Sequence, residues 1–357
     1  MRKKITALTK KCSSCGFDMV FDPDKKSLFC VSCHNKQDIV SKPGLNKHNL
    51  NTEDTLLNHE NQEWAQEMKT MQCPNCGAHS VLQNFNTSAT CPYCNTSLIA
   101  SNEHFNGLKP DSIIPFQFGK SKAEQLFKEK LKKKWFLPNK FKNSINADEI
   151  NAYYFPTFVF DAECSTNYTG RLYKNVKSRK ENGETETVRK YFHIDGLKET
   201  KHENIEIEAS THLSQYELEA IKPYDFKQAE NYSDAYVQGY SLEHYSNSAK
   251  DSYKKAKSII KKEIKEIILN KYKHDGVDDF EMDTMFSNEK YSYCVLPLYR
   301  INYSYKNTNY SNVMNGQTGS LGGKYPKSGW KISLLVMSIL MVVLFPIFAF
   351  VVATLVL

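Results

Sequence analysis

The sequence predicts an α+β protein, and three observations support this fold class. Four Cys-x-x-Cys pairs form two copies of one pattern, CSSCGFDMVFDPDKKSLFCVSC at 12–33 and CPNCGAHSVLQNFNTSATCPYC at 73–94. Helix-type and strand-type apolar spacings alternate after the second copy. The chain then ends in an uncharged apolar stretch, from Ile332 to Leu357. These features predict two small metal-held ribbons, a mixed α+β body and one C-terminal transmembrane helix.

A metal site explains the cysteine pattern. Four thiolates satisfy a tetrahedral zinc ion, and two Cys-x-x-Cys turns on facing hairpins supply them without a large apolar core. Cysteine fills all four positions in each copy, which leaves no open coordination position for chemistry. We therefore expect two structural Zn²⁺ ions. The predicted ligands are Cys12, Cys15, Cys30, Cys33, Cys73, Cys76, Cys91 and Cys94.

Two alternatives to zinc sites made of four cysteines remain open at this point. A rubredoxin-like iron site uses the same four ligands, and His34, which follows Cys33, offers an imidazole nitrogen. The residue after the second cysteine of each pair is also expected to adopt a left-handed backbone, which Gly, Asn and His enter readily. The residues at these places are Gly16, His34, Gly77 and Asn95.

Length and composition predict several folded units. The first ribbon is expected at 1–40, and the second at 72–102. A polar linker and a helical spacer are expected between them, at 41–71, because Thr52 can cap a helix whose apolar side chains follow at helical spacing. The α+β body is expected at 108–328.

Within the body, local patterns predict individual elements. KSKAEQLFKEKLKKKWF and SAKDSYKKAKSIIKKEIKEIILNKY have helical apolar spacing, a hairpin is expected around KSRKENGETE, and Asn315-Gly316 predicts a tight turn. In each half, a basic helix is followed later by a Pro-containing aromatic strand, YFPTFVF and then CVLPLYRI. This weak repeat favours a duplicated α+β layout.

The C-terminal stretch predicts a membrane span at 330–357. Its 26 uncharged residues would measure about 39 Å as a helix, against roughly 30 Å for a hydrocarbon core. Trp330 and Lys331 stand where interfacial residues are expected, and the positive-inside rule then places the body in the cytoplasm. The predicted location is the cell membrane, with a single pass. A reducing compartment also suits paired metal-binding cysteines.

Several blocks in a fixed order resemble a bacterial family of zinc-ribbon proteins. They are CPNCGAHSV with TSATCPYC, LKPDSIIPFQFGKSKAE, YYFPTFVFDAE, IKPYDFKQAENYSDAYVQGY and MNGQTGSLGG. Members of this largely uncharacterised family are often labelled transcription-factor-type or helicase-like. The resemblance covers about residues 65–330 and implies a ribbon followed by a body, without an assigned activity. Phe158, Tyr299 and Thr157 depart from the aromatic residues expected there.

Catalytic motifs are not apparent in the sequence. Gly119-Lys120-Ser121 resembles the end of a phosphate-binding loop, but Ile114 occupies the place of the required earlier glycine. Cys164 and Cys294 are candidate thiol nucleophiles, although their apolar strand contexts favour buried, inert side chains. We therefore interpret the chain as a non-enzyme.

Charge predicts two basic helical faces. Ten lysines lie in 108–142 and nine in 250–273. Solvated helix faces are the simplest explanation, and phosphates or anionic lipid headgroups are the alternative ligands. Only five of the 47 basic residues are Arg, which disfavours reading of bases. The candidate anion-binding residues are Lys128, Lys130, Lys132, Lys133, Lys134, Lys254, Lys255, Lys257, Lys261, Lys262 and Lys265.

Two functions of different class follow as hypotheses. The first is a membrane-anchored cytosolic adaptor or scaffold, whose zinc ribbons present rigid surfaces to a protein partner. The second is a membrane-associated nucleic-acid-binding protein that uses its ribbons and Lys-rich helices. An enzyme is a more distant third.

Overall fold

The computed structural model describes residues 10–52, 69–77, 79–82, 88–91, 96–99, 108–143, 145, 147, 149–179, 185–210 and 212–356. For 69–70, 79–82, 88–90, 97–99 and 346–356 it describes the backbone alone. The predicted helical spacer lies almost wholly outside the described residues, as do Asn95 and Cys94.

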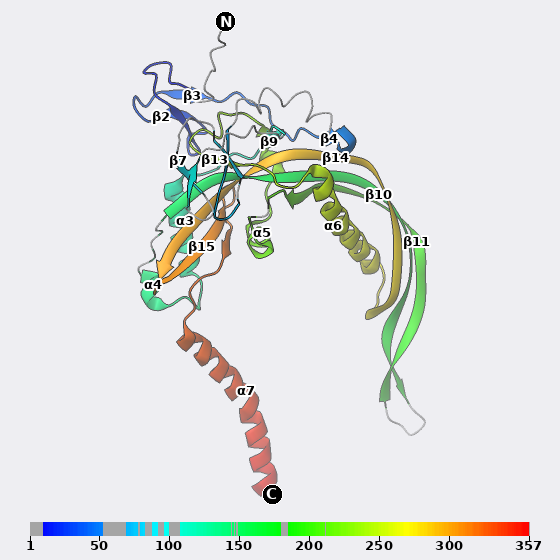
Figure 1. Cartoon of the computed structure of the whole chain (residues 1–357). Coiled ribbons are helices and arrows are strands. Elements are labelled where there is room, and N and C mark those ends of the chain that lie inside the picture. The colour runs from blue at the N-terminus through cyan, green and yellow to red at the C-terminus, as the bar shows by residue number, and fades with distance from the viewer. Residues whose placement is uncertain are drawn as a thin grey trace.

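Three long strands form an arch (Figure 1). They are β10 (Glu149–Arg179), β11 (Thr185–Glu208) and β14 (Gly276–Tyr305), and β10 pairs with both others in antiparallel fashion. Register shifts near Asp161 divide β10 into two parts. We call the part of these three strands beyond Asp161 the wing. It comprises residues 161–179, 185–205 and 276–290.

The strands belong to an 11-stranded mixed sheet. Its path runs β12 (Glu230–Asn231), β9 (Ser112–Ile113), β14, β10, β13 (Ser241–Glu243), β6 (His79–Leu82) and β5 (Lys69–Gln72). β11 joins β10, whereas β4 (His48–Asn49) and β15 (Thr308–Asn315) join β14, and β16 (Leu321–Gly323) joins β15. β13 and β9 run parallel to their long neighbours.

Two smaller sheets contain the other ribbon strands, whereas β5 and β6 belong to the large sheet. β1 (Met19–Asp22), β2 (Ser27–Cys30) and β3 (Lys36–Asp38) form one sheet, and β7 (Ser88–Thr90) pairs with β8 (Ser97–Ile99) in the other. Short 3-10 turns occur at Leu50–Thr52 and Phe226–Gln228.

The middle of the arch is buried on both faces. In β10, Tyr154 and Phe158 join the core that contains the first ribbon and α3 (Lys120–Lys132), whereas Tyr153 and Phe155 join the core beneath α5 (Gln215–Ile221). This explains why the segment reads as a continuous apolar run rather than as an alternation.

In the wing, the described residues cover one face of the sheet and leave the other exposed. Ile260, Ile264 and Ile268 of α6 (Ala249–Asn270) pack there against alternate residues of the wing strands, such as Tyr168 and Leu172. The other face carries the intervening residues and is exposed. α6 lies on the concave side of the arch (Figure 1). The helices predicted around α3 and α6 are confirmed, and a further short helix is α4 (Asn139–Asn143).

The predicted α+β body with a duplicated layout is wrong. Strands dominate the fold, and β10 and β14 alone extend over 31 and 30 residues. The two Pro-containing aromatic segments are neighbours in one sheet, with Tyr154 opposite Pro297 and Pro156 opposite Val295. Local periodicity did not reveal how far the strands continue, because the wing residues are largely charged. The predicted hairpin around 180–184 is confirmed, with Arg179 opposite Thr185.

The predicted transmembrane helix at 330–357 is also wrong. α7 (Gly329–Val356) forms, but among the residues that the structure describes no helix is long and apolar enough to cross a membrane. The predicted single-pass membrane location rested on this helix and is not retained.

Candidate metal centres

The four cysteines of the first ribbon lie together. All four Sγ atoms are within 4.8 Å of one another, with Cys12 and Cys33 sulfurs 3.5 Å apart and those of Cys15 and Cys30 3.4 Å apart. A disulfide requires about 2.05 Å. Zinc–sulfur bonds of about 2.3 Å in a tetrahedron place the sulfurs about 3.8 Å apart. The cluster therefore fits a tetrahedral metal ion.

Two tight turns position these sulfurs. Gly16 (φ 74°) donates its N–H to the Cys12 carbonyl at 2.9 Å, and His34 (φ 62°) donates to the Cys30 carbonyl at 3.0 Å. Gly77 of the second ribbon, at φ 74°, repeats the contact with the Cys73 carbonyl. The predicted left-handed conformation is confirmed at these three positions. It follows that the geometry of these Cys-x-x-Cys turns is set by local sequence.

His34 is not part of the cysteine cluster. Its ring lies 5.5 Å from that of Phe29, centroid to centroid, on the surface of the ribbon. A different polar neighbour supports the site, since Asn35 Nδ2 lies 3.7 Å from Cys12 Sγ and donates to Ser14 Oγ at 3.1 Å. The cluster thus consists of cysteines, and the side chain of Asn35, which lies outside the Cys-x-x-Cys turns, contacts it.

Hydrogen bonds within the cluster move the pKa values of Cys12 and Cys33 in opposite directions. A backbone hydrogen bond from Ser14 outweighs burial and lowers the pKa of Cys12 to about 6. A backbone bond from Asn35 acts to lower the pKa of Cys33, but the side chains of Cys15 and Cys12, together with burial, raise it to about 12. Without a cation, Cys33 therefore keeps its proton, and a bound metal ion would supply the positive charge that lets all four sulfurs act as thiolate ligands.

The second ribbon repeats the arrangement in its described part. Cys73, Cys76 and Cys91 form a cluster of sulfurs within 4.8 Å of one another, and the Cys76 and Cys91 sulfurs are 3.5 Å apart. Cys94, the predicted fourth ligand, lies outside the described residues. β6 of this ribbon pairs with β13, with Val81 opposite Leu242, so the ribbon extends the main sheet.

The first ribbon packs on the body. Phe21 on β1 donates its N–H to the Gln238 carbonyl at 2.9 Å, and its side chain joins the largest core cluster together with Met19 and Leu28. Phe17 and Val31, next to the cysteine pairs, are 59% and 61% exposed. The ribbon therefore has buried side chains that anchor it to the body and exposed apolar side chains that do not contact the core.

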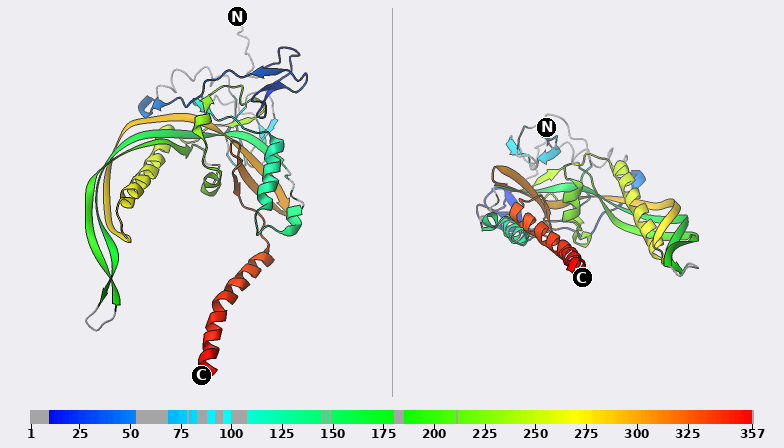
Figure 2. Two further views of the ribbon diagram at one scale, coloured as in Figure 1. Left: turned by 180° about the vertical axis from the view of Figure 1, so that it is seen from behind. Right: turned by 90° about the horizontal axis from the view of Figure 1, so that it is seen from below.

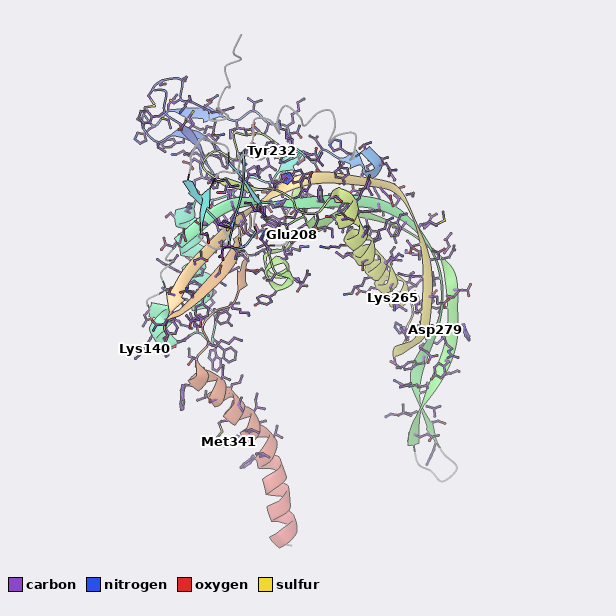
Figure 3. The ribbon with its side chains drawn as sticks, viewed as in Figure 1. Lys140, Glu208, Tyr232, Lys265, Asp279 and Met341 are labelled. Carbon is purple, nitrogen blue, oxygen red and sulfur yellow. The ribbon has the colours of Figure 1, made fainter. Side chains whose placement is uncertain are left out.

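The two lysine sets are not brought together. α3 and α6 lie at opposite ends of the arch (Figure 2), and Lys265 of α6 lies far from Lys140 near α3 (Figure 3). Some of these lysines serve structural contacts, because Lys128 pairs with Glu124 at 2.6 Å and Lys257 with Glu289 at 3.1 Å. Most of the others are exposed, which leaves two separate basic surfaces.

The segment after the first ribbon, residues 41–48, is held against the body by side-chain hydrogen bonds. Ser41 Oγ lies 2.8 Å from Tyr236 Oη, and Lys47 Nζ donates to Asp161 Oδ2 at 2.6 Å. His48 Nε2 lies 2.7 Å from Asp111 Oδ1, at a cleft of about 620 Å³. Sequence spacing gave no signal for this His–Asp pair, since 63 positions separate the two residues.

The two isolated cysteines are buried. Cys164 is 4% exposed and Cys294 is fully enclosed. Burial raises the pKa of both thiols, which disfavours the nucleophilic thiolate. Both side chains therefore serve the core.

One bacterial relative aligns with nearly the whole chain. It is an uncharacterized protein of Bacillus subtilis (strain 168), YdjG, which is 28% identical over 335 residues, covering 91% of this chain and 92% of that protein. No protein-family description matches the chain, and no solved structure matches it. The comparisons and the cysteine clusters thus support a bacterial relative and two potential metal sites, while the resemblance to a zinc-ribbon family is not independently confirmed.

Proposed function

We propose that this protein is an adaptor: a non-enzymatic binding protein whose ribbons each hold one structural zinc ion and present rigid surfaces to a protein partner. The observation that carries the proposal is the cluster of four cysteine sulfurs in the first ribbon, within 4.8 Å of one another. With four thiolates a zinc ion is fully coordinated, and its role is to hold the fold.

The placement of the first ribbon supports a docking role. The ribbon is fixed on the body through Phe21, so its exposed surface has a defined orientation. The exposed side chains of Phe17 and Val31 on that surface are of the kind that protein partners cover. A structural zinc keeps this surface rigid, which lowers the entropic cost of binding.

Metal content tests the first half of the proposal. The full chain, purified without added metal, should contain two zinc ions by plasma mass spectrometry, and Cys30→Ser with Cys33→Ser should retain one. The visible absorbance of an iron–thiolate site in the purified chain would contradict the assignment.

Crosslinking tests the second half. A photoreactive residue at Val31 should capture a specific protein in cells, and the same residue at Lys132, exposed on the end of α3, serves as the control. Capture that is equal from both positions, or unchanged by Cys30→Ser with Cys33→Ser, would count against a ribbon-mediated adaptor.

Nucleic-acid binding is the second candidate. It is favoured by the row of exposed lysines on α6, including Lys254, Lys261 and Lys262. Because α3 lies at the other end of the arch, the two helices would contact separate phosphate groups. Fluorescence anisotropy of the full chain with DNA and RNA should show affinity that falls steeply between about 50 and 200 mM salt if this candidate is right.

A further inference from the structure

The two faces of the wing differ in charge, with exposed lysines on α6 and a cluster of carboxylates on the outer face, beside the paired cations Arg171 and Lys201. Successive residues of a strand point to opposite faces of the sheet. α6 covers the concave face of the wing, and the outer face carries exposed carboxylates from all three strands. Lys265 on α6 and Asp279 on β14 are labelled in Figure 3. The exposed carboxylates of the outer face are those of Glu163, Asp195, Glu199, Asp279, Glu281 and Asp283.

Two exposed apolar side chains lie among these carboxylates. Leu197 on β11 is 60% exposed and Met285 on β14 is 71% exposed. Leu197 pairs with Asn167 and Met285 with Ser165, so two strand spacings and a two-residue offset separate them. Strands about 4.8 Å apart with a rise of about 3.4 Å per residue place the two side chains about 12 Å apart.

α6 carries the complementary pattern. Ile259 and Ile267 are 40% and 43% exposed, although the other isoleucines at helical spacing along α6 are buried. Eight residues of helix separate them, which at about 1.5 Å per residue is also about 12 Å. Lys255 and Lys262 are exposed on either side of Ile259. The helix therefore presents an apolar pair among Lys255, Lys262 and the exposed carboxylate Glu266, whereas the outer face presents an apolar pair with carboxylates.

We propose that α6 of a second copy of this chain docks on the outer face of the wing. Ile259 and Ile267 of one copy cover Leu197 and Met285 of the next, and the α6 lysines meet the surrounding carboxylates. This interaction is separate from the ribbon surfaces and from the proposed adaptor function. The protein would then have a second interaction surface, through which two copies recognise each other by charge and by the matched spacing of their apolar pairs.

The geometry dictates the form of the assembly. Since α6 and the acidic face lie on opposite sides of one wing, the same two copies cannot exchange the contact reciprocally. Such heterologous contacts extend in one direction instead of closing into a dimer. Association should therefore grow with protein concentration, and it should weaken with salt because exposed charges are screened.

Charge reversal provides the test, by sedimentation velocity of the full chain at about 10–100 μM. Wild type should associate at about 50 mM NaCl and dissociate by about 500 mM. Lys255→Glu with Lys262→Glu should weaken association at least tenfold, and so should Glu281→Lys with Asp283→Lys. An equimolar mixture of the two variants should restore association, because each reversed surface then meets its complement.

A matched control is Lys132→Glu with Lys133→Glu on the exposed end of α3, which should associate like wild type. Circular dichroism verifies that every variant is folded. A wild-type chain that stays monomeric to about 100 μM overturns the proposal. So does association that persists in both reversed variants or strengthens with salt, which would point to apolar contacts elsewhere. Binding of polylysine by a chain that stays monomeric also overturns it, because the face then serves a different basic partner.

Discussion

Phe21 of the first ribbon lies edge-on against Tyr236 of the body, with ring centroids 5.2 Å apart. Phe21 is 3% exposed and also approaches Tyr240, at 6.3 Å. A metal-binding ribbon of this kind could have been an independent module on a linker. Here its hydrophobic side belongs to the same core as α3 and the long strands.

Replacing Phe21 by Ala should destabilise the whole protein. A buried Phe→Ala change costs roughly 3 to 5 kcal/mol through lost burial and a residual cavity. The control is Phe17→Ala in the same ribbon, which removes an exposed ring and should change the free energy of unfolding by about 0.5 kcal/mol or less. Urea unfolding with zinc present measures both. Equal effects of the two changes would show that the ribbon does not share the body core.

Loss of metal from the first ribbon should loosen the body locally. Without its metal, β1 no longer holds Phe21 against Tyr236, and the hydrogen bond from Phe21 N–H to the Gln238 carbonyl is lost. Hydrogen exchange of peptides covering 232–240 should therefore accelerate at least tenfold in Cys30→Ser with Cys33→Ser. Cys76→Ser in the second ribbon is the control and should leave these peptides protected. Unchanged exchange in the first variant would disprove the coupling.

Features set by local sequence could be predicted, and features set by distant contacts could not. The Cys-x-x-Cys turn at Gly16 follows from a short motif, and the buried face of α6 follows from helical spacing. By contrast, Ser41 contacts Tyr236 across 195 positions, and no periodicity encodes that pairing. The length of β14 was missed for a related reason, because charged residues such as Asp279 and Glu281 alternate on the exposed face of a strand and resemble a loop.

Gly316 occupies a position with no room for a side chain. It lies in the predicted turn between β15 and β16, which is confirmed, since Asn315 N–H donates to the Ser320 carbonyl at 2.9 Å. A Cβ at Gly316 would come within 2.5 Å of Phe116 and 2.8 Å of Pro297. Both neighbours are held in the core, so the backbone would have to move.

Gly316→Ala should therefore destabilise the protein by roughly 1 to 3 kcal/mol, as overpacking does elsewhere. Gly329→Ala at the start of α7 is the matched control, because a Cβ added there would meet no atom within 4 Å and the change should be neutral or slightly stabilising. Thermal unfolding compares the two variants. A stable Gly316→Ala protein would mean that the ring of Phe116 can move aside.

Glu208 makes stability depend on pH in an unusual direction. It lies on the concave side of the arch between α5 and α6 (Figure 3), where burial outweighs a hydrogen bond from Ser210 and raises the pKa of Glu208 from 4.5 to about 7. The folded state therefore binds the proton more tightly than the unfolded chain. The stability due to protonation is complete below about pH 4.5 and is lost as the pH rises through about 7.

Glu208→Gln removes this charge while its amide oxygen can still accept from Ser210. The variant should be more stable than wild type by roughly 3 kcal/mol at about pH 8, because the pKa rises from 4.5 to about 7 and one unit of pKa corresponds to about 1.4 kcal/mol. The advantage should become small near about pH 4.5, where Glu208 is neutral in the folded state and about half neutral in the unfolded chain. Urea unfolding of both proteins between about pH 4.5 and 8 measures the difference, in which contributions from groups common to the two chains cancel. A difference that is constant across this range would show that Glu208 is not the titrating group.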